Sequence, residues 1–449
     1  NLGTLTVTNS VLDARGANGR IYRFGQSASA KNGFRGDYNL YSFRNNGSLL
    51  AEQMTLTGGS DFYNNMPSWS AAVSSETHSI TLPPLFANDV QGDFHPRSPQ
   101  GRFTPSGWVT DGELSPLVDA GNPAWSMTNE PAPNGGRINI GAHGNTPQAS
   151  MTQTNPPWVR VASYNECADT VTGDALLYWL YGGLDSNELV KLEYTTDFWN
   201  WNPIATNLPV GQGIYEWDVS DMPLAVSMNW RVVVQNATNV FDESDCAVAI
   251  KTKSYEYYIN DAGPTNDDVY CTAPGAGWDP WVIRGTNRET PLNSLQTLLE
   301  HLPVSGGDRI YIDTGVYPVS ATNAIILDDR NMGSEAFPLE IVGSTNWAAG
   351  GTWFQVDGTT NGMRIQNTRH IHLKNIRVSG ARNGLSVESV DTLRIQDGEF
   401  FGNQANGIQV GGSSGVEVRN SLILGNGEYG VQSRGAKGAQ SLRNVTLWG

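Results

Sequence analysis

The stretch NGLSVESVDTLRIQDGEFFGN, residues 383–403, decides the fold because three nearby stretches repeat its pattern. They are NGMRIQNTRHIHLKNIRVSGA at 361–381, NGIQVGGSSGVEVRNSLILGN at 406–426 and GVQSRGAKGAQSLRNVTLWG at 430–449. The period is 22 to 24 residues, and apolar residues alternate with polar ones inside each unit. So short a period with two-residue alternation predicts a parallel β-helix, in which each repeat is one coil and stacked coils share a core.

Aligned positions of the repeats form columns, from which the side-chain directions follow. We expect Ile365, Val387 and Val410 to point inward. Asparagine and glycine tolerate left-handed backbone angles, so their columns predict tight bends between strands. The four columns are Met363, Leu385, Ile408 and Val431; Leu373, Ile395, Val418 and Leu442; Asn375, Asp397, Asn420 and Asn444; and Gly380, Gly402, Gly425 and Gly449.

The composition excludes several classes of partner. The chain of 449 residues has a formal net charge of −16, which repels nucleic acids and anionic membranes. A run of about 18 apolar residues is absent, so no membrane span is predicted. The chain opens on a strand-like segment without an initiator methionine, so we expect a piece of a longer, secreted or cell-surface polypeptide.

Residues 1–150 carry three motifs in a fixed order. They are SITLPPLFANDVQGDFHPRSPQGRF from Ser79, LSPLVDAGNPAW from Leu114 and NEPAPNGGRINIGAHG from Asn129. The order resembles the DPLF…GDFHL…SPLIDAG…GxIDIGAxG run of large secreted bacterial β-helix proteins, with departures at Pro84 and Pro96. The resemblance implies that 1–150 is the C-terminal part and cap of a β-helix.

Residues 151–157 contain Pro156 and Pro157 and are predicted to be a linker. Residues 158–252 contain seven short strand-like segments separated by turn signals, which favours a two-sheet sandwich with Trp179 and Trp217 in its core. The segment resembles immunoglobulin-like and fibronectin-like modules of bacterial surface proteins. Cys167 and Cys246 bracket this module, and the sequence leaves open whether they pair. Residues that fall on the module's pattern are Trp179, Tyr194, Asp197, Trp201, Trp217, Arg231 and Asp245.

Residues 255–449 are predicted to be the N-terminal part of a second β-helix. The opening YEYYINDAGPTNDDVYCTA resembles the segment that starts such domains in the same secreted proteins. A helix is expected near 290–302, with Thr290 as its N-cap and Pro291 in its first turn. Its leucines lie on one face, so it is expected to plug the end of the coil stack. The predicted fold class is all-β, with right-handed parallel β-helix segments flanking an immunoglobulin-like sandwich.

Pectate lyases and polygalacturonases share the β-helix fold, yet neither the NTD…GDD…GHG…RIK series nor the RxPxxR run occurs here. Fold alone carries no activity, so we predict no enzyme, no catalytic residues and no cofactor. The acidic loop with Asp261, Asp267 and Asp268 leaves a calcium site open, although its spacing is not that of an EF-hand. His370 and His372 are expected to face solvent beside poor metal ligands.

Two surfaces are candidates for recognition. Lys374, Gln396, Arg419 and Arg443 form an outward column, for which we weigh contact with an acidic glycan or another subunit against a solvated face. Trp199 and Trp201 are candidates for a glycan platform, or for sandwich core.

The predicted function is a structural or adhesive segment of a giant repetitive cell-surface protein. The alternative is a β-helix that binds or degrades polysaccharide. We also expect head-to-tail contact with copies or tandem repeats, although a direct join would leave only 14 residues between Asn444 and Asn9.

Overall fold

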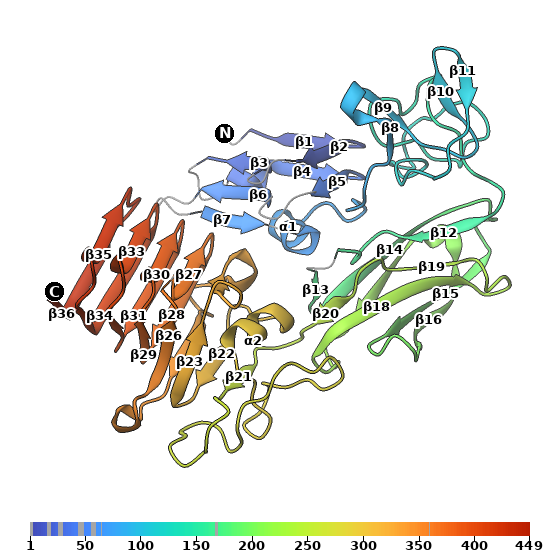
Figure 1. The fold of residues 1–449 in the computed structure, drawn as a ribbon. Coiled ribbons are helices and arrows are strands. Elements are labelled where there is room, and N and C mark those ends of the chain that lie inside the picture. Colours follow the sequence, from blue (N-terminus) through green and yellow to red (C-terminus); the bar gives the residue numbers. More distant parts are fainter. Residues whose placement is uncertain are drawn as a thin grey trace. The chain divides into compact units, whose positions relative to one another are not determined.

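A computed structural model describes residues 3–15, 19–25, 30–43, 49–54, 60–63, 65–166, 169–358 and 360–449. The chain forms two compact units, described separately below (Figure 1). The first comprises Asn1–Phe24, Ser29–Glu52 and Tyr63–Thr252. The second comprises Gly25–Ala28, Gln53–Phe62 and Lys253–Gly449.

The second unit is a stack of parallel coils with three faces, which confirms the predicted β-helix. The first face contains β21 (Glu256–Ile259), β22 (Arg309–Ile312), β25 (Leu339–Gly343), β28 (Arg369–Lys374), β31 (Asp391–Gln396), β34 (Ser414–Leu424) and β36 (Gln440–Trp448). The second contains β23 (Gly315–Val319), β26 (Thr352–Val356), β29 (Ile376–Ser379) and β32 (Glu399–Phe401), continued by the C-terminal halves of β34 and β36. The third contains β24 (Ile325–Leu327), β27 (Met363–Gln366), β30 (Asn383–Glu388), β33 (Asn406–Gly411) and β35 (Tyr429–Arg434).

The inward columns form the core of this stack as predicted. Ile365 pairs in register with Val387, and Val387 with Val410, and all three side chains are buried. In the last coil, residues in register with buried residues of β34 reach solvent: Leu442, opposite Val418, is 47 % exposed, and Leu447, opposite Ile423, is 51 % exposed. Burial therefore depends on a coil lying on both sides, as expected for a stack of repeats.

The bends of the coils are columns of left-handed residues. Asn375, Asp397, Asn420 and Asn444 have φ of 50–55°, and Gly380, Gly402 and Gly425 have φ of 55–74°. Both predicted bend columns are confirmed. A further column was not predicted: His370, Thr392 and Gly415 have φ of 51°, 64° and 63°.

The helix α2 (Leu295–His301) begins later than predicted. Its N-cap is Ser294, whose side chain accepts a hydrogen bond from the Thr297 backbone, so the assignment of Thr290 as N-cap is wrong. The reason is that Leu292 forms parallel bridges with Ile259 and Ala276, which hold this backbone extended. The expected apolar face is present, because Leu295, Leu298 and Leu299 are buried.

Asp313 holds the segment that contains Val269, Tyr270 and Cys271, which belongs to the opening motif of this unit. Its buried carboxylate accepts hydrogen bonds from the backbone nitrogens of Val269, Tyr270 and Cys271 at 2.6–2.7 Å. It therefore fastens the loop after β21 to the first full coil.

The first unit starts with short parallel pairs, β1 with β4 and β2 with β5, and ends its coiled part in an irregular cap. In the cap, Asp119 of the SPLVDAG motif accepts a hydrogen bond from the Gly135 backbone, and burial raises the pKa of Asp119 to about 6. Asn9 at the β1–β2 bend accepts from the Asn122 backbone, tying the cap to this coil. The elements that lie wholly or partly in this unit are β1 (Leu5–Thr8), β2 (Val11–Ala14), β3 (Arg20–Phe24), β4 (Phe34–Asp37), β5 (Leu40–Phe43), β6 (Leu49–Met54), β7 (Ser60–Tyr63), α1 (Met66–Val73), β8 (Phe86–Asn88), β9 (Asp93–Pro96), β10 (Arg102–Thr104) and β11 (Gly107–Val109).

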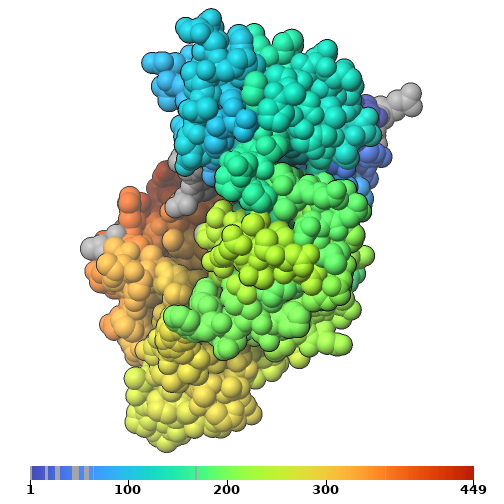
Figure 2. All heavy atoms as spheres, turned by 90° about the vertical axis from the view of Figure 1, so that its right-hand side faces the viewer, coloured from blue at the N-terminus to red at the C-terminus, as the bar shows by residue number. Residues whose placement is uncertain are grey.

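A two-sheet sandwich completes the first unit. One sheet has the order β12 (Trp158–Val161), β14 (Asp174–Gly182), β17 (Ile214–Asp218). The other has the order β13 (Thr170–Val171), β20 (Val248–Ile250), β18 (Ala225–Val234), β15 (Leu189–Thr195), β16 (Asn202–Pro209), with β19 (Phe241–Glu243) beside β18. Trp179 and Trp217 lie in the core between the sheets, as predicted. Atoms of the sandwich (green) lie on the face shown in Figure 2.

The sandwich also packs against the cap. Tyr178 and Leu180 of β14 share a buried cluster with Leu117 and Ile140 of the cap.

Cys246 is disulfide-bonded and Cys271 is a buried free thiol, whereas Cys167 lies outside the described residues. In the described part of the chain, no helix has the length and hydropathy needed to cross a bilayer.

Candidate functional site

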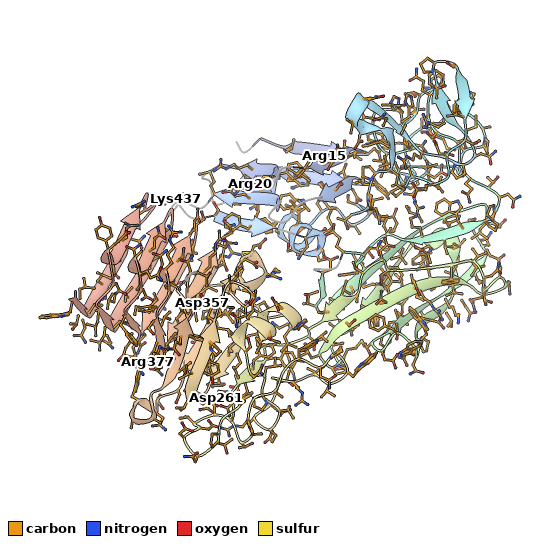
Figure 3. All side chains as sticks on the ribbon, in the orientation of Figure 1. Arg15, Arg20, Asp261, Asp357, Arg377 and Lys437 are labelled. Atoms are coloured by element: carbon orange, nitrogen blue, oxygen red, sulfur yellow. The ribbon has the colours of Figure 1, made fainter. Side chains whose placement is uncertain are left out.

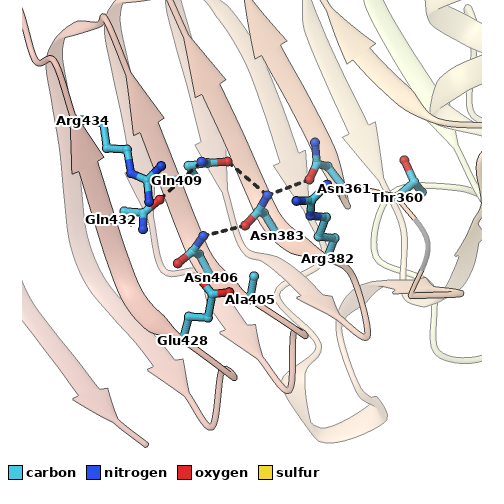
Figure 4. Close-up of a pocket in the computed structure, with 10 residues that line it drawn as sticks. All are labelled: Thr360, Asn361, Arg382, Asn383, Ala405, Asn406, Gln409, Glu428, Gln432 and Arg434. Carbon is cyan, nitrogen blue, oxygen red and sulfur yellow. Dashed lines mark hydrogen bonds between the residues drawn. The ribbon is translucent and has the colours of Figure 1, made fainter.

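The third face of the β-helix carries a groove of about 510 Å³ that runs from the residues preceding β27 across β30, β33 and β35 (Figure 4). We call it the amide groove, because amide side chains line most of its floor. Its lining residues are Thr360, Asn361, Arg382, Asn383, Ala405, Asn406, Gln409, Glu428, Gln432 and Arg434.

The amides form a continuous hydrogen-bonded ladder across the coils (Figure 4). Asn383 donates to Asn361 at 2.9 Å, and Asn406 donates to Asn383 at 2.7 Å. A second branch runs from Asn383 to Gln409 at 3.1 Å, and from Gln409 to Gln432 at 3.3 Å. Register places these residues one above another, because β30 pairs with β33 and β33 with β35.

The ladder stops at Asn406. Its Oδ1 is buried and has no hydrogen-bond partner in the described part of the chain. The next rung is Tyr429, which pairs with Asn406 in register and offers no amide donor there. A buried acceptor without a donor costs about 1–3 kcal/mol, so a hydroxyl or water beside Glu428 would stabilise this end of the groove.

Charged side chains form the rim. Arg382, Arg434 and Glu428 are exposed, and no ion pair to any of them occurs among the described residues. Each amide offers both a donor and an acceptor, which suits hydroxyl groups, since hydroxyls also do both. The rim adds two guanidinium groups and one carboxylate, so the groove is polar and only weakly charged.

The predicted column of Lys374, Gln396, Arg419 and Arg443 lies on the first face, not in this groove. The four residues pair in register across β28, β31, β34 and β36, as the repeat alignment required. Arg419 donates to Gln396, while Lys374 is exposed and its side chain forms no hydrogen bond or ion pair within the described part of the chain.

The acidic loop does not gather a metal-binding group. Asp261 (Figure 3) accepts from the Gly263 backbone at 2.7 Å, and Asp268 accepts from Asn260 at 2.6 Å. Burial, and then nearby carboxylates including Asp267, raise the pKa of Asp268 to about 6. Within the described ranges, no group of three or more His, Cys, Asp or Glu is placed to hold a metal ion.

The histidine candidates lie on β28, and the tryptophan candidates lie in the connection between β15 and β16 of the sandwich. Ile371 and Leu373 point inward, as predicted, and burial lowers the pKa of His372 between them. Trp199 is 78 % exposed at the tip between β15 and β16, whereas the Arg231 guanidinium lies 4.0 Å from the Trp201 ring centre. The two tryptophans therefore do not form an open pair.

Reasoning from sequence alone missed the amide groove. The signal was present: Asn361, Asn383 and Asn406 each precede a glycine at the start of a repeat. The repeat alignment shows that this asparagine column exists, but not that its side chains pair with the glutamines that follow.

Comparisons with known proteins agree with the fold. A family model described as "Right handed beta helix region" matches residues 322–447, which supports the predicted handedness. No curated protein matches this chain. Among solved structures, the crystal structure of pectate lyase Pel9A matches with 13 % identity and a TM-score of 0.24, covering 39 % of this chain and 55 % of that one. A similarity at this level carries no argument about fold or activity, and the support for the fold comes from the family model.

Proposed function

We propose that this segment is an adhesive β-helix of an extracellular protein, which binds a neutral polysaccharide in the amide groove without cleaving it. The observation that carries the proposal is the amide ladder, which repeats hydrogen-bonding groups once per coil. Strands in a sheet are about 4.8 Å apart, so the groove offers a regular series of partners to a regular series of hydroxyls. Regular spacing suits a polymer better than a single small molecule.

The charges of the groove favour a neutral ligand. Two arginines and one glutamate surround a floor made of uncharged amides. We propose that the groove does not cleave its ligand, because hydrolysis of a glycosidic bond ordinarily uses two carboxylates that flank the bond. Glu428 is the one carboxylate among the lining residues.

The variant Gln409→Ala tests this binding. Gln409 is half-exposed and lines the groove, so Gln409→Ala removes the donor and the acceptor that its amide offers to ligand hydroxyls and leaves the core intact. At about 1 kcal/mol for each hydrogen bond lost to the ligand, we expect binding to weaken about tenfold. The measurement is retardation in native gels that contain xylan, cellulose derivatives or dextran.

Gln355→Ala is the matched control, because Gln355 is an exposed glutamine on β26, on a different face. It should migrate like the parent protein. If none of the neutral polymers retards the parent protein, or if both glutamine variants behave alike, the amide groove is not the site.

A second candidate function, stacking of copies end to end, rests on Asn9. Asn444 donates to Asn420 at 2.9 Å, continuing a ladder of bend residues. Asn9 has the same left-handed bend, with φ of 50°, and its buried Nδ2 has no partner among the described residues. A coil ending like β36 would offer the Asn444 Oδ1 to this donor, with Leu442 aligned on Val7 and Leu447 on Leu12.

The variant Asn9→Asp tests stacking, since it keeps the oxygen that accepts from Asn122 but removes the donor. Sedimentation velocity should show concentration-dependent association of the parent protein that the variant weakens. A parent protein that stays monomeric at all concentrations would exclude stacking between separate copies.

A further inference from the structure

The first face of the β-helix carries two neighbouring outward columns, which together we call the basic face. We infer that the basic face is a binding site for an acidic polysaccharide. One column is Arg309, Glu340, His372, Arg394, Glu417 and Ser441; the other is Tyr311, Val342, Lys374, Gln396, Arg419 and Arg443.

The charge of this face is opposite to that of the protein. Five side chains in the two columns are cationic and two are carboxylates, whereas the whole chain has a net charge of −16. A local positive surface on an acidic protein attracts anions. The negative charge of the other surfaces repels large polyanions that would contact more of the protein than this face. The cations also lie in rows that follow the coil axis, because strand pairing sets them in register.

Both carboxylates of the basic face already lie beside basic side chains of the same face. Glu340 accepts from Arg309 and lies 3.8 Å from His372. Glu417 lies 3.7 Å from Arg394 and 3.7 Å from Arg443. Three positive charges therefore remain uncompensated within the two columns, and they are available to a ligand.

Lys374 and Arg419 form the centre of this surplus. They line one groove of about 350 Å³, together with Arg394 and Gln396. Arg394 keeps 53 % of its side chain exposed and Arg443 keeps 74 %, so their guanidinium groups reach solvent despite their contacts with Glu417. Guanidinium groups bind carboxylate and sulfate oxygens in pairs, which favours such anions over isolated small ions.

Tyrosine rings adjoin the same groove. Tyr311 lines it, stacks on Tyr258 with ring centres 5.5 Å apart, and lies 4.7 Å from the ring of Tyr270. Aromatic rings present apolar faces with polar hydroxyls at the edge, which suits the mixed surface of a sugar ring. Cations in register beside aromatic rings thus fit a chain of sugars that carry acidic groups.

The occupant is a glycan rather than a nucleic acid. A net charge of −16 opposes the dense phosphate charge of nucleic acid over any extended contact. A polysaccharide with one carboxylate or sulfate per sugar, or fewer, needs only the few cations that this face supplies. The inference goes beyond the proposed function, because the basic face and the amide groove are on different faces of the β-helix and bind ligands of different charge.

Binding of the whole segment to immobilised polygalacturonate tests the inference. We expect binding at low salt that weakens at 0.5 M NaCl. The reason is that the Debye length, over which exposed charges interact, falls from about 10 Å at 0.1 M toward about 3 Å at 1 M ionic strength. Lys374→Glu should weaken it about tenfold, and Lys374→Glu combined with Arg419→Glu should abolish it. Lys374→Gln provides a milder variant should the charge reversals fail to fold, with an expected loss of about threefold.

Lys437→Glu is the matched control (Figure 3), because Lys437 is an exposed lysine outside the basic face and the net charge changes equally. It should bind polygalacturonate like the parent protein. κ-Carrageenan, a sparsely sulfated galactan, in place of polygalacturonate distinguishes sulfate from carboxylate as the preferred acidic group. The inference is overturned if the parent protein does not bind either polymer at low salt, if Lys437→Glu weakens binding as much as Lys374→Glu, or if duplex DNA binds equally tightly. Gln409→Ala should leave this binding unchanged, so the two sites fail or succeed separately.

Discussion

Trp179→Ala should lower the free energy of unfolding of the sandwich by about 3–5 kcal/mol, the usual cost of deleting a buried tryptophan. Trp179 is fully buried between the two sheets, among Leu177, Leu192 and Trp230. Its Nε1 donates to the Val210 carbonyl at 3.0 Å, so the truncation also leaves a buried acceptor unpaired. Urea unfolding followed by near-ultraviolet circular dichroism measures the change.

Trp199→Ala is the control in the same module, because Trp199 is 78 % exposed and its ring is not part of the core. Its expected effect is within about 0.5 kcal/mol. Trp217→Ala should resemble Trp179→Ala, since Trp217 is buried against Tyr194. Equal, small effects of Trp179→Ala and Trp199→Ala would contradict the sandwich core.

Val387→Asp should destabilise the β-helix by at least about 3 kcal/mol, because it places a carboxylate in the apolar centre of the coil stack without a partner. Val387 is 1 % exposed and lies between Ile365 and Val410 in neighbouring coils. Circular dichroism at 25 °C, with and without urea, measures the loss.

Ser386→Asp tests the same strand one residue earlier. Ser386 points outward and is half-exposed, so aspartate there should change stability by about 0.5 kcal/mol or less. A shift of the register by one residue would exchange inward and outward side chains. A harmless Val387→Asp with a disruptive Ser386→Asp would therefore show that the register is wrong.

The coil stack was predictable because its signal is repeated four times. Each inward position recurs, and asparagine and glycine report directly on left-handed bends such as those at Asn375 and Gly380. The bend at Thr392 was not predictable, since a β-branched residue rarely adopts positive φ; Thr392 lies in register between His370 and Gly415, which have the same left-handed backbone in the neighbouring coils. The start of α2 was missed for a related reason: the bridges made by Leu292 are long-range contacts that a local capping pattern does not reveal.

One of the two candidate sites was predictable from the sequence and the other was not. The column of Lys374, Arg419 and Arg443 followed from the repeat alignment, because register alone places those residues together. The amide groove did not follow, since its ladder depends on side chains from two columns meeting between coils, as Asn383 meets Gln409. Periodicity gives the direction of a side chain but not which neighbouring column it contacts.

We expect the β-helix to bind a neutral polysaccharide in the amide groove and to leave it intact. The most direct test of this expectation is prolonged incubation with a retained neutral polymer, such as xylan, followed by chromatography of the polymer by size and assay of new reducing ends. The account predicts that the polymer binds, that binding depends on Gln409, and that chain length stays unchanged. Polymer shortened by the parent protein but not by Glu428→Gln would contradict the account and make the groove an active site.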